Sequence, residues 1–333
     1  MTLPAVRSFA LTDWDVVLQL LHAPMGRESL ARGFAWVQSP PVPELPDLDV
    51  VADAFHAALT GRSVKAVRTQ MPLTVRGTPA ELDALVGQTI TRIHRLGKML
   101  DVALDRDRVV VNPMLTGRFQ LAWHGEKPPA GTAVELVFGD RTVGPPADAA
   151  KWTAAASWMP ADNASPIVRY KDPTQMGKVY LLPAGVERPV PGRGPGEMGP
   201  DALDPALTLE AWRERIRKHP GELKNLLRNQ AFVAGIGNAY SDEILFAARL
   251  QPFRKRASLA AEEVDDLYAA MRSVLPASID LLRERVPPTF EKQVRDHLAV
   301  HNRGGEPCPR CGTKITSVKA GGSPTGFCRG CQR

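Results

Sequence analysis

Two pairs, Cys308-Pro-Arg-Cys311 and Cys328-Arg-Gly-Cys331, contain all four cysteines of the chain. Sixteen residues separate the pairs, a spacing typical of zinc ribbons. Each pair directs two thiolates toward one point, and a hairpin between the pairs completes a closed tetrahedral site. The sequence therefore predicts one structural zinc ion per chain. Disulfides are the weaker interpretation because no secretory signal precedes them, and a redox pair would not need a second matching pair.

The segment that contains these cysteines is also the most basic part of the chain. The 333 residues have a net charge of +6. Residues 291–333 alone contain eight Lys and Arg against three Asp and Glu. A positive field concentrated in one module favours a polyanionic partner, and a solubilising tail is the alternative.

Composition indicates a globular protein of two or three domains, since 44% of the residues are hydrophobic and 23% are charged. No segment approaches the roughly 20 apolar residues that a membrane helix needs. The first 42 residues do not form a secretory signal, because Asp13 and Asp15 interrupt their apolar run. We therefore expect a cytoplasmic protein.

Upstream of the cysteines, residues 208–282 have the apolar spacing of successive helices, the first with Thr208 as its expected cap. Between these helices lies the stretch Gly235-Ile-Gly-Asn238, in which two glycines deliver Asn238 to a helix start. Free amides at a helix start can bind phosphate. Glycine turns between helices are common, however, and most bind nothing.

Short apolar alternations separated by turn residues fill the region from Val64 to Leu182, as in an antiparallel sandwich or barrel. Four residues before it share one helical face: Leu48, Val51, Phe55 and Leu59. Asp47 is the expected cap of this helix, and Gly61 is the expected stop. The Pro- and Gly-rich stretch from Pro183 to Leu203 reads as an interdomain linker.

Several motifs occur in one order along the chain: PELPDLDV, LGKML, NPMLTGR, YKDPTQMGKVYL, MGPDAL, GIGNAYSDEILF and the cysteine ribbon ending FCRGCQR. In these motifs the chain resembles the formamidopyrimidine-DNA glycosylase and endonuclease VIII family from Pro43 to Arg333. The resemblance implies an α+β multidomain fold, and a monomer that binds damaged double-stranded DNA near the nucleoid. Its expected parts are a β-sandwich catalytic domain with flanking helices (43–182), a linker (183–203), a helix-two-turn-helix domain (204–295) and a zinc finger (296–333).

In that family the mature chain starts at the proline of PELP, here Pro43. A free secondary amine can attack C1′ of a damaged nucleotide, expel the base and form an iminium, whereas an amide nitrogen cannot. Because 42 residues precede Pro43, we expect them to be an extension created by a misplaced start, with Val42 written for a GUG initiation codon. The alternative is a genuine extension, with Pro43 serving only as a helix-entry residue.

The resemblance implies roles for further residues. Glu44 would protonate or polarise the departing sugar oxygen, while Lys98 and Asn238 would bind phosphates beside the lesion. As alternatives, Glu44 caps a helix and Lys98 is a solvated hairpin lysine. Positions matching the loops that fill the space left by the flipped base are Leu115, Gln175 and Met176.

Two positions depart from the family pattern. Where the formamidopyrimidine branch has DPRRFG, this chain has Asp172-Pro-Thr-Gln-Met-Gly177, so recognition of 8-oxoguanine opposite cytosine is not expected. The arginine of the family's finger is replaced by Ser323, and Lys319 and Arg329 are the nearby cations that would compensate. The implied lesions are those of the endonuclease VIII branch, oxidised pyrimidines or abasic sites, or a lesion outside both branches.

Two classes of function follow. The first is a bifunctional DNA glycosylase and abasic-site lyase acting by β/δ-elimination. The second is a non-catalytic binder of damaged or abasic DNA that retains the scaffold. A nucleic-acid adaptor outside repair is a weaker third interpretation.

Overall fold

The computed structural model describes residues 42–144, 146, 152, 157–320 and 323–333. The predicted extension lies outside these residues except for Val42. No helix in the described ranges is long and apolar enough to cross a membrane.

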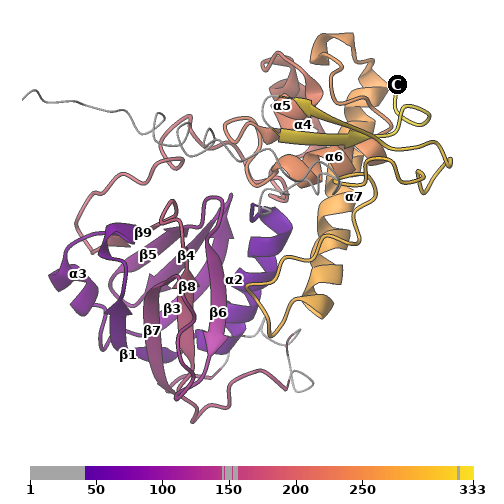
Figure 1. Cartoon of the computed structure of the whole chain (residues 1–333). Coiled ribbons are helices and arrows are strands. Elements are labelled where there is room, and N and C mark those ends of the chain that lie inside the picture. Colours follow the sequence, from indigo (N-terminus) through magenta and orange to yellow (C-terminus); the bar gives the residue numbers. More distant parts are fainter. Residues whose placement is uncertain (1–41, 145, 147–151, 153–156, 321–322) are drawn as a thin grey trace, which may run out of the picture. The chain divides into compact units, whose positions relative to one another are not determined.

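The first half of the described chain is a β-sandwich, as the alternating apolar pattern predicts (Figure 1). One sheet has the order β1-β7-β8-β6, all antiparallel. Its strands are β1 (Arg62–Thr69), β7 (Thr132–Arg141), β8 (Ile167–Lys171) and β6 (Arg118–Ala122). The other has the order β2-β9-β5-β4-β3, antiparallel except for the parallel pair β2 and β9. Its strands are β2 (Val75–Arg76), β9 (Lys178–Leu182), β5 (Arg108–Asn112), β4 (Met99–Leu104) and β3 (Ile90–Leu96). The short helices η1 (Pro72–Thr74) and α3 (Pro79–Asp83) lie between β1 and β3 in the chain.

The inner faces of the two sheets enclose an apolar core. Val109 and Val111 of β5 line the same interior space as Phe119 of β6 and Phe138 of β7. Inward residues alternate with outward ones because successive side chains of a strand point to opposite faces. Burial of these side chains, at about 1.5–3 kcal/mol each, provides the main stabilisation of the sandwich.

Helix α2 (Leu45–Leu59) packs against β3 on one side and against α7 (Ala261–Arg285) on the other. The predicted apolar face is buried, and Gly61 ends the helix region with φ of +82°. The expected cap is wrong: the N-cap residue is Glu44, and Asp47 lies in the first turn. The Asp47 carboxylate still serves the helix start, since it accepts the Glu44 N–H at 2.8 Å.

The second half is helical, with a hairpin at its end. The helices are α4 (Leu209–Arg217), α5 (Leu223–Arg228), α6 (Asn238–Ala247), η3 (Arg256–Ser258) and α7. Thr208 caps α4 as predicted, because its side chain accepts the Ala211 N–H. Strands β10 (Thr316–Ala320) and β11 (Ser323–Phe327) form the antiparallel hairpin between the cysteine pairs. This hairpin packs on α6 (Figure 1).

Candidate active site

Pro43 lies immediately before α2 and is buried. It lines a small pocket together with Arg118, Phe290 and Gln293, which come from distant parts of the chain. In the sequence as written its nitrogen forms the peptide bond to Val42. A nucleophilic role therefore requires a chain that begins at Pro43, because an amide lone pair is delocalised into its carbonyl.

Glu44 binds the start of helix α6, which is 193 residues away in the sequence. Its carboxylate accepts three backbone N–H groups, from Gly237 at 2.8 Å, Ala239 at 2.8 Å and Tyr240 at 3.2 Å. The side chain is 2% exposed. A carboxylate at a helix N-terminus is stabilised by the free amides and by the helix dipole. Glu44 thus joins the start of the sandwich domain to the helical domain.

The glycines of the GIGN stretch make this contact possible. A Cβ on Gly237 would lie 2.3 Å from the Glu44 Cδ, and one on Gly235 would lie 2.7 Å from the Leu45 Cδ1. The backbone at Gly235 also has φ of +101°, a conformation that favours glycine. The predicted anion-binding helix start is therefore present, but the group bound to its amides is the Glu44 carboxylate.

Asn238 itself lies at the first position of α6, and its Nδ2 donates to the Pro324 carbonyl at 2.9 Å. Its Oδ1 is buried without a hydrogen-bond partner among the described residues. A contact between Asn238 and a DNA phosphate stays a prediction. The amides of Gly237, Ala239 and Tyr240 are already engaged by Glu44, so such a contact would use the second N–H of the Asn238 Nδ2.

Lys98 lies in the tight turn between β3 and β4 and is partly buried. Burial lowers the pKa of its ammonium group, the negative charge of Glu44 acts in the opposite direction, and the positive charge of Arg228 adds to the lowering. These three side chains therefore lie within one another's fields. The burial of Lys98 argues against a fully solvated hairpin lysine, and its contact with a phosphate stays a prediction.

The three predicted void-filling residues lie on two loops, one between β5 and β6 and one between β8 and β9. Leu115 and Met176 are 41% and 45% exposed, which is unusual for large apolar side chains in this chain. Gln175 has φ of +54°, a left-handed conformation that is uncommon outside glycine. Exposed apolar tips on fixed loops suit insertion into a base stack, and this role stays a prediction.

Asp172 fixes the two loops to each other. Its carboxylate accepts the Gly177 N–H at 2.6 Å and the Thr174 N–H at 3.2 Å within its own loop. It also accepts the Thr116 hydroxyl from the other loop. Asp172 is fully buried, so these bonds are shielded from water. Leu115 and Met176 are consequently presented by one connected unit.

A buried charge cluster attaches the hairpin to the helices, and sequence reasoning missed it. Asp242 of α6 accepts Lys224 Nζ of α5 at 2.6 Å and the Gly326 N–H of β11 at 3.1 Å. The His301 Nδ1 lies 2.8 Å from the same carboxylate. Lys224 also donates to the Pro324 carbonyl at 3.1 Å. The only sequence signal is that two charged residues occupy positions on otherwise apolar helical faces.

A second helix carboxylate, Glu243, reinforces the attachment. It accepts the N–H groups of Ala299, Val300 and His301 at 2.7–2.9 Å. Burial raises the pKa of Glu243, and the three donated N–H groups oppose that shift. The ribbon is therefore anchored to α6 through buried polar groups.

The four cysteines converge as their spacing predicts. All four sulfur atoms lie within 4.8 Å of one another, with 3.8 Å between Cys308 and Cys331 and 3.5 Å between Cys311 and Cys328. Tetrahedral zinc with Zn–S bonds of about 2.3 Å requires sulfur atoms about 3.8 Å apart. The donor set and its geometry therefore fit a structural zinc ion.

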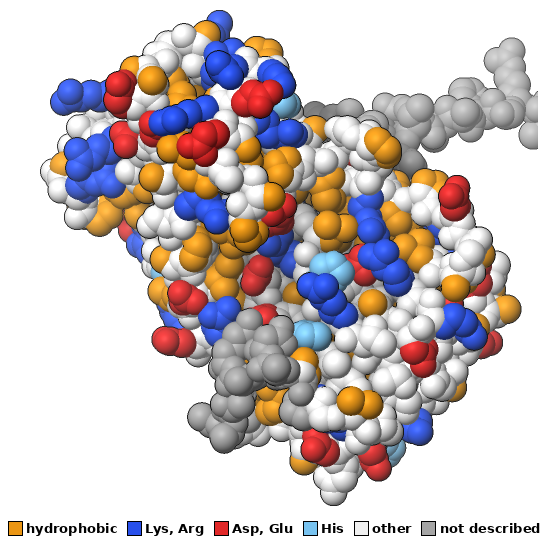
Figure 2. Space-filling model, turned by 180° about the vertical axis from the view of Figure 1, so that it is seen from behind, with side chains coloured by type: hydrophobic (Ala, Val, Ile, Leu, Met, Phe, Trp, Pro, Cys, Tyr) orange, Lys and Arg blue, Asp and Glu red, His pale blue; other side chains and the backbone are white. Residues whose placement is uncertain are grey.

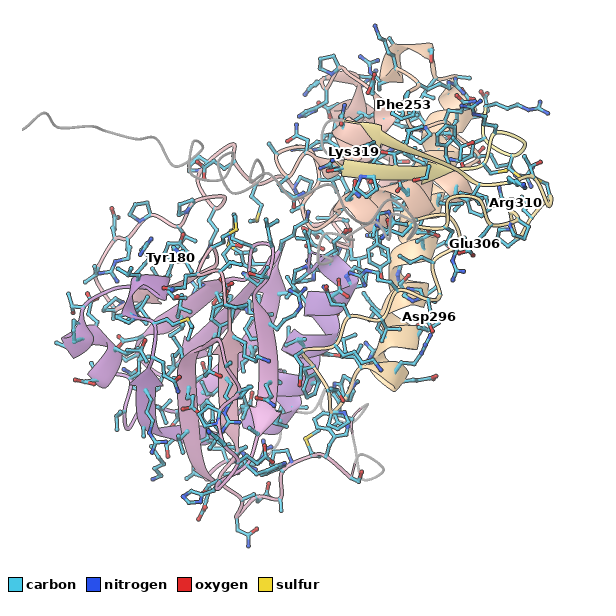
Figure 3. The ribbon with its side chains drawn as sticks, viewed as in Figure 1. Tyr180, Phe253, Asp296, Glu306, Arg310 and Lys319 are labelled. Carbon is cyan, nitrogen blue, oxygen red and sulfur yellow. The ribbon has the colours of Figure 1, made fainter. Side chains whose placement is uncertain are left out.

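The hairpin residues proposed to replace the finger arginine lie at different places. Lys319 of β10 is exposed and opposite Pro324, next to Ser323 (Figure 3). Arg329 follows the far end of β11, six residues from Ser323, a separation of about 20 Å along an extended strand. Arg329 therefore lies at the zinc end of the hairpin, away from the position it was expected to serve, and its contact with DNA stays a prediction. On the face of the molecule drawn in Figure 2, basic and acidic side chains are interspersed.

Models of three known domains match this chain. The formamidopyrimidine-DNA glycosylase N-terminal domain matches residues 42–154, the H2TH domain of the same enzyme matches 198–286, and the zinc finger found in FPG and IleRS matches 305–333. The domain boundaries predicted from the sequence are not tested by these matches and stay predictions.

Relatives match over their whole length. The formamidopyrimidine-DNA glycosylase of Heliobacterium modesticaldum is 33% identical over 301 residues, covering 88% of this chain and 100% of the relative. That of Geobacillus kaustophilus is 30% identical over 302 residues, covering 88% and 100%. Two crystal structures of the Lactococcus lactis enzyme, one with abasic-site DNA and one with FAPY-dG DNA, share the fold. Each has a TM-score of 0.72 and 24% identity, covering 87% of this chain and 99% or 100% of the solved chain. The protein thus belongs to the formamidopyrimidine-DNA glycosylase family.

Proposed function

We propose that the protein is a base-excision DNA glycosylase that binds damaged double-stranded DNA, and that it is also an abasic-site lyase when its chain begins at Pro43. The observation that carries the proposal is the Glu44 carboxylate held at the start of α6, directly beside Pro43 and within the field of Lys98. A nucleophile position and a carboxylate from one segment lie there with the predicted phosphate-binding cation from another. A scaffold that only binds DNA would not require this convergence.

In the proposed reaction, the Pro43 amine forms a bond to C1′ and the glycosidic bond to the damaged base breaks. The base leaves with the bonding electrons and takes up a proton, and the sugar ring opens to give an iminium between proline and C1′. Loss of a C2′ proton then expels the 3′ phosphate by β-elimination, and a second elimination releases the 5′ phosphate. Water finally hydrolyses the iminium and restores the Pro43 amine.

Glu44 is proposed to protonate or polarise the ring oxygen of the sugar as the ring opens, and to stabilise the positive charge of the iminium. Both carboxylate oxygens accept N–H groups from α6, so the side chain is held in one position before substrate binds. Its negative charge adjoins the nitrogen that becomes positive during the reaction, and such preorganised charge lowers the barrier. Lys98 holds a flanking phosphate, which places C1′ near Pro43.

Lesion choice is proposed to follow the endonuclease VIII branch, with oxidised pyrimidines or abasic sites as substrates. Thr174 and Gln175 stand where the other branch has two arginines, so no guanidinium at this loop reads an opposite cytosine. Leu115 and Met176 instead offer apolar tips that fill the vacated stack irrespective of the opposite base.

Borohydride trapping tests the proposal, because borohydride reduces an iminium to a stable amine. A chain that begins at Pro43 should become covalently attached to abasic-site DNA, whereas the full 333-residue chain should not. In the short form, Pro43→Gly should retain weak trapping because a primary amine remains. Glu44→Gln should lose base excision before it loses trapping on a ready-made abasic site.

The alternative is a non-catalytic binder of damaged or abasic DNA. The amide state of Pro43 in the sequence as written favours it, since the nitrogen then lacks a free lone pair. If neither chain length is trapped although both bind abasic DNA, the binder is correct. If both are trapped equally, another amine is the nucleophile and the Pro43 mechanism is wrong.

A further inference from the structure

Ser323 is the first residue of β11 in the finger hairpin, and an arginine of the helical domain contacts it. The Arg228 Nη2 donates to the Ser323 Oγ at 3.3 Å, across 95 positions of sequence. Arg228 is the last residue of α5 and is partly buried. A neutral hydroxyl is a weak partner for a guanidinium, which has five donors and a full charge.

Arg228 shares its surroundings with two lysines and with the Glu44 carboxylate. Arg228 and Lys224 contact successive residues of β11, Ser323 and Pro324. Burial lowers the pKa of both Lys98 and Lys224, and the positive charge of Arg228 adds to the lowering. Lys224 is neutralised by its buried ion pair with Asp242. Glu44 is held by three amides of α6.

Lys98 and Arg228 are the two cations of this group that lack a direct contact with an anion, although the negative charge of Glu44 acts on Lys98. Within the described ranges, no hydrogen bond or ion pair joins either of them to a carboxylate. Two partly buried like charges repel each other and lose hydration, so their proximity is unfavourable until an anion binds between them. An ammonium group and a planar guanidinium together suit a phosphodiester, the first as a point charge and the second as a two-pronged donor.

We propose that Arg228 is a DNA-binding residue that grips a phosphodiester of the damaged strand beside Ser323, at the turn end of the β10–β11 hairpin, and that it acts with Lys98 on the backbone of that strand. The cation thus comes from α5 of the helical domain, and Ser323 positions it through its hydroxyl. This inference rests on the proposed DNA-binding function and deepens it, because it assigns a residue outside the hairpin to the place that Ser323 leaves uncharged.

The test measures affinity for a duplex that carries a tetrahydrofuran abasic analogue, over a range of salt concentrations. Arg228→Ala should reduce the slope of log affinity against log salt by about 0.9, the value for one phosphate contact. It should also weaken binding roughly tenfold at moderate salt. Arg228→Lys should keep the slope, because the charge remains, while losing part of the affinity.

Arg213→Ala is the matched control, since Arg213 is an exposed arginine of α4 that pairs with Asp265. The slope of log affinity against log salt for Arg213→Ala should equal that of the wild type. An unchanged slope in Arg228→Ala overturns the inference, and so does an equal loss of slope in Arg228→Ala and Arg228→Lys, which would indicate a structural role. If the wild-type protein binds no duplex, the proposed function itself is wrong. That result differs from an unchanged slope in Arg228→Ala, which refutes only the role of Arg228.

Discussion

Replacement of Glu44 by glutamine should destabilise the protein as well as impair its chemistry. The Oε2 atom accepts N–H groups from Gly237 and Tyr240, and Oε1 accepts the one from Ala239. Glutamine has one acceptor oxygen, so its amino group must face at least one of these donors. The less costly orientation keeps the oxygen at the Oε2 position and leaves the Ala239 N–H opposed by an NH2 group.

The magnitude follows from these contacts. A buried donor without an acceptor costs about 1–3 kcal/mol. Loss of the negative charge at the start of α6 removes a further contribution of about 0.5–1 kcal/mol. We therefore expect Glu44→Gln to lower the free energy of unfolding by about 2–4 kcal/mol.

Denaturant titration followed by circular dichroism measures this change. Glu214→Gln is the matched control, because Glu214 is exposed on α4 and pairs with Lys218 at the surface. That variant should change the free energy of unfolding by less than about 0.5 kcal/mol. A Glu44→Gln protein as stable as the control variant would show that the three α6 hydrogen bonds do not form in solution, and the convergence on which the proposed site depends would be refuted.

Three further measurements test other parts of the molecule. Asp242→Asn leaves the Lys224 ammonium, which is 4% exposed, without its counter-charge. The free energy of unfolding should therefore fall by about 3–5 kcal/mol. A loss below about 1 kcal/mol would contradict this prediction. Burial lowers the pKa of Lys98 in the folded state. The unfolded chain therefore binds more protons between that lowered pKa and the ordinary 10.5, and stability relative to Lys98→Met should rise with pH across that window. A pH-independent difference in unfolding midpoint would contradict the lowered pKa. Elemental analysis should find one zinc ion per chain. The Cys308→Ser variant should lose this ion, and the loss should weaken DNA binding and loosen α6 before the β-sandwich unfolds. A folded, metal-free protein that still binds DNA would exclude the zinc site.

Much of the fold could be predicted because its signals are local. Alternation of apolar residues indicated strands that include β4, β5, β6, β7 and β9, and apolar residues three or four positions apart indicated the buried face of α2. The cysteine spacing indicated the ribbon, since two thiolate pairs joined by a hairpin have few other solutions. The helix start at α2 is misplaced because Asp is a preferred N-cap residue, whereas here the Asp47 carboxylate lies in the first turn and bonds backward to the Glu44 N–H.

The site contacts could not be predicted in the same way, because they join residues far apart in the chain. Glycines and Asn238 correctly indicated an anion at the start of α6, but free amides do not specify which anion. The carboxylate of Glu44 lies 193 positions away and takes the place predicted for phosphate. The contact of Arg228 with Ser323 likewise depends on how α5 and the hairpin pack, which no local pattern contains.

Helix α6 connects the proposed reaction centre to the hairpin of the zinc finger. Its first turn binds Glu44, and one turn later Asp242 and Glu243 bind β11 and the segment that leads into the ribbon. A packed helix of ten residues is far stiffer than a loop, so a displacement of the hairpin by a bound phosphate would be passed to the Glu44 carboxylate. Release of the ribbon by zinc removal or by Asp242→Asn should therefore impair base excision even when the β-sandwich remains folded.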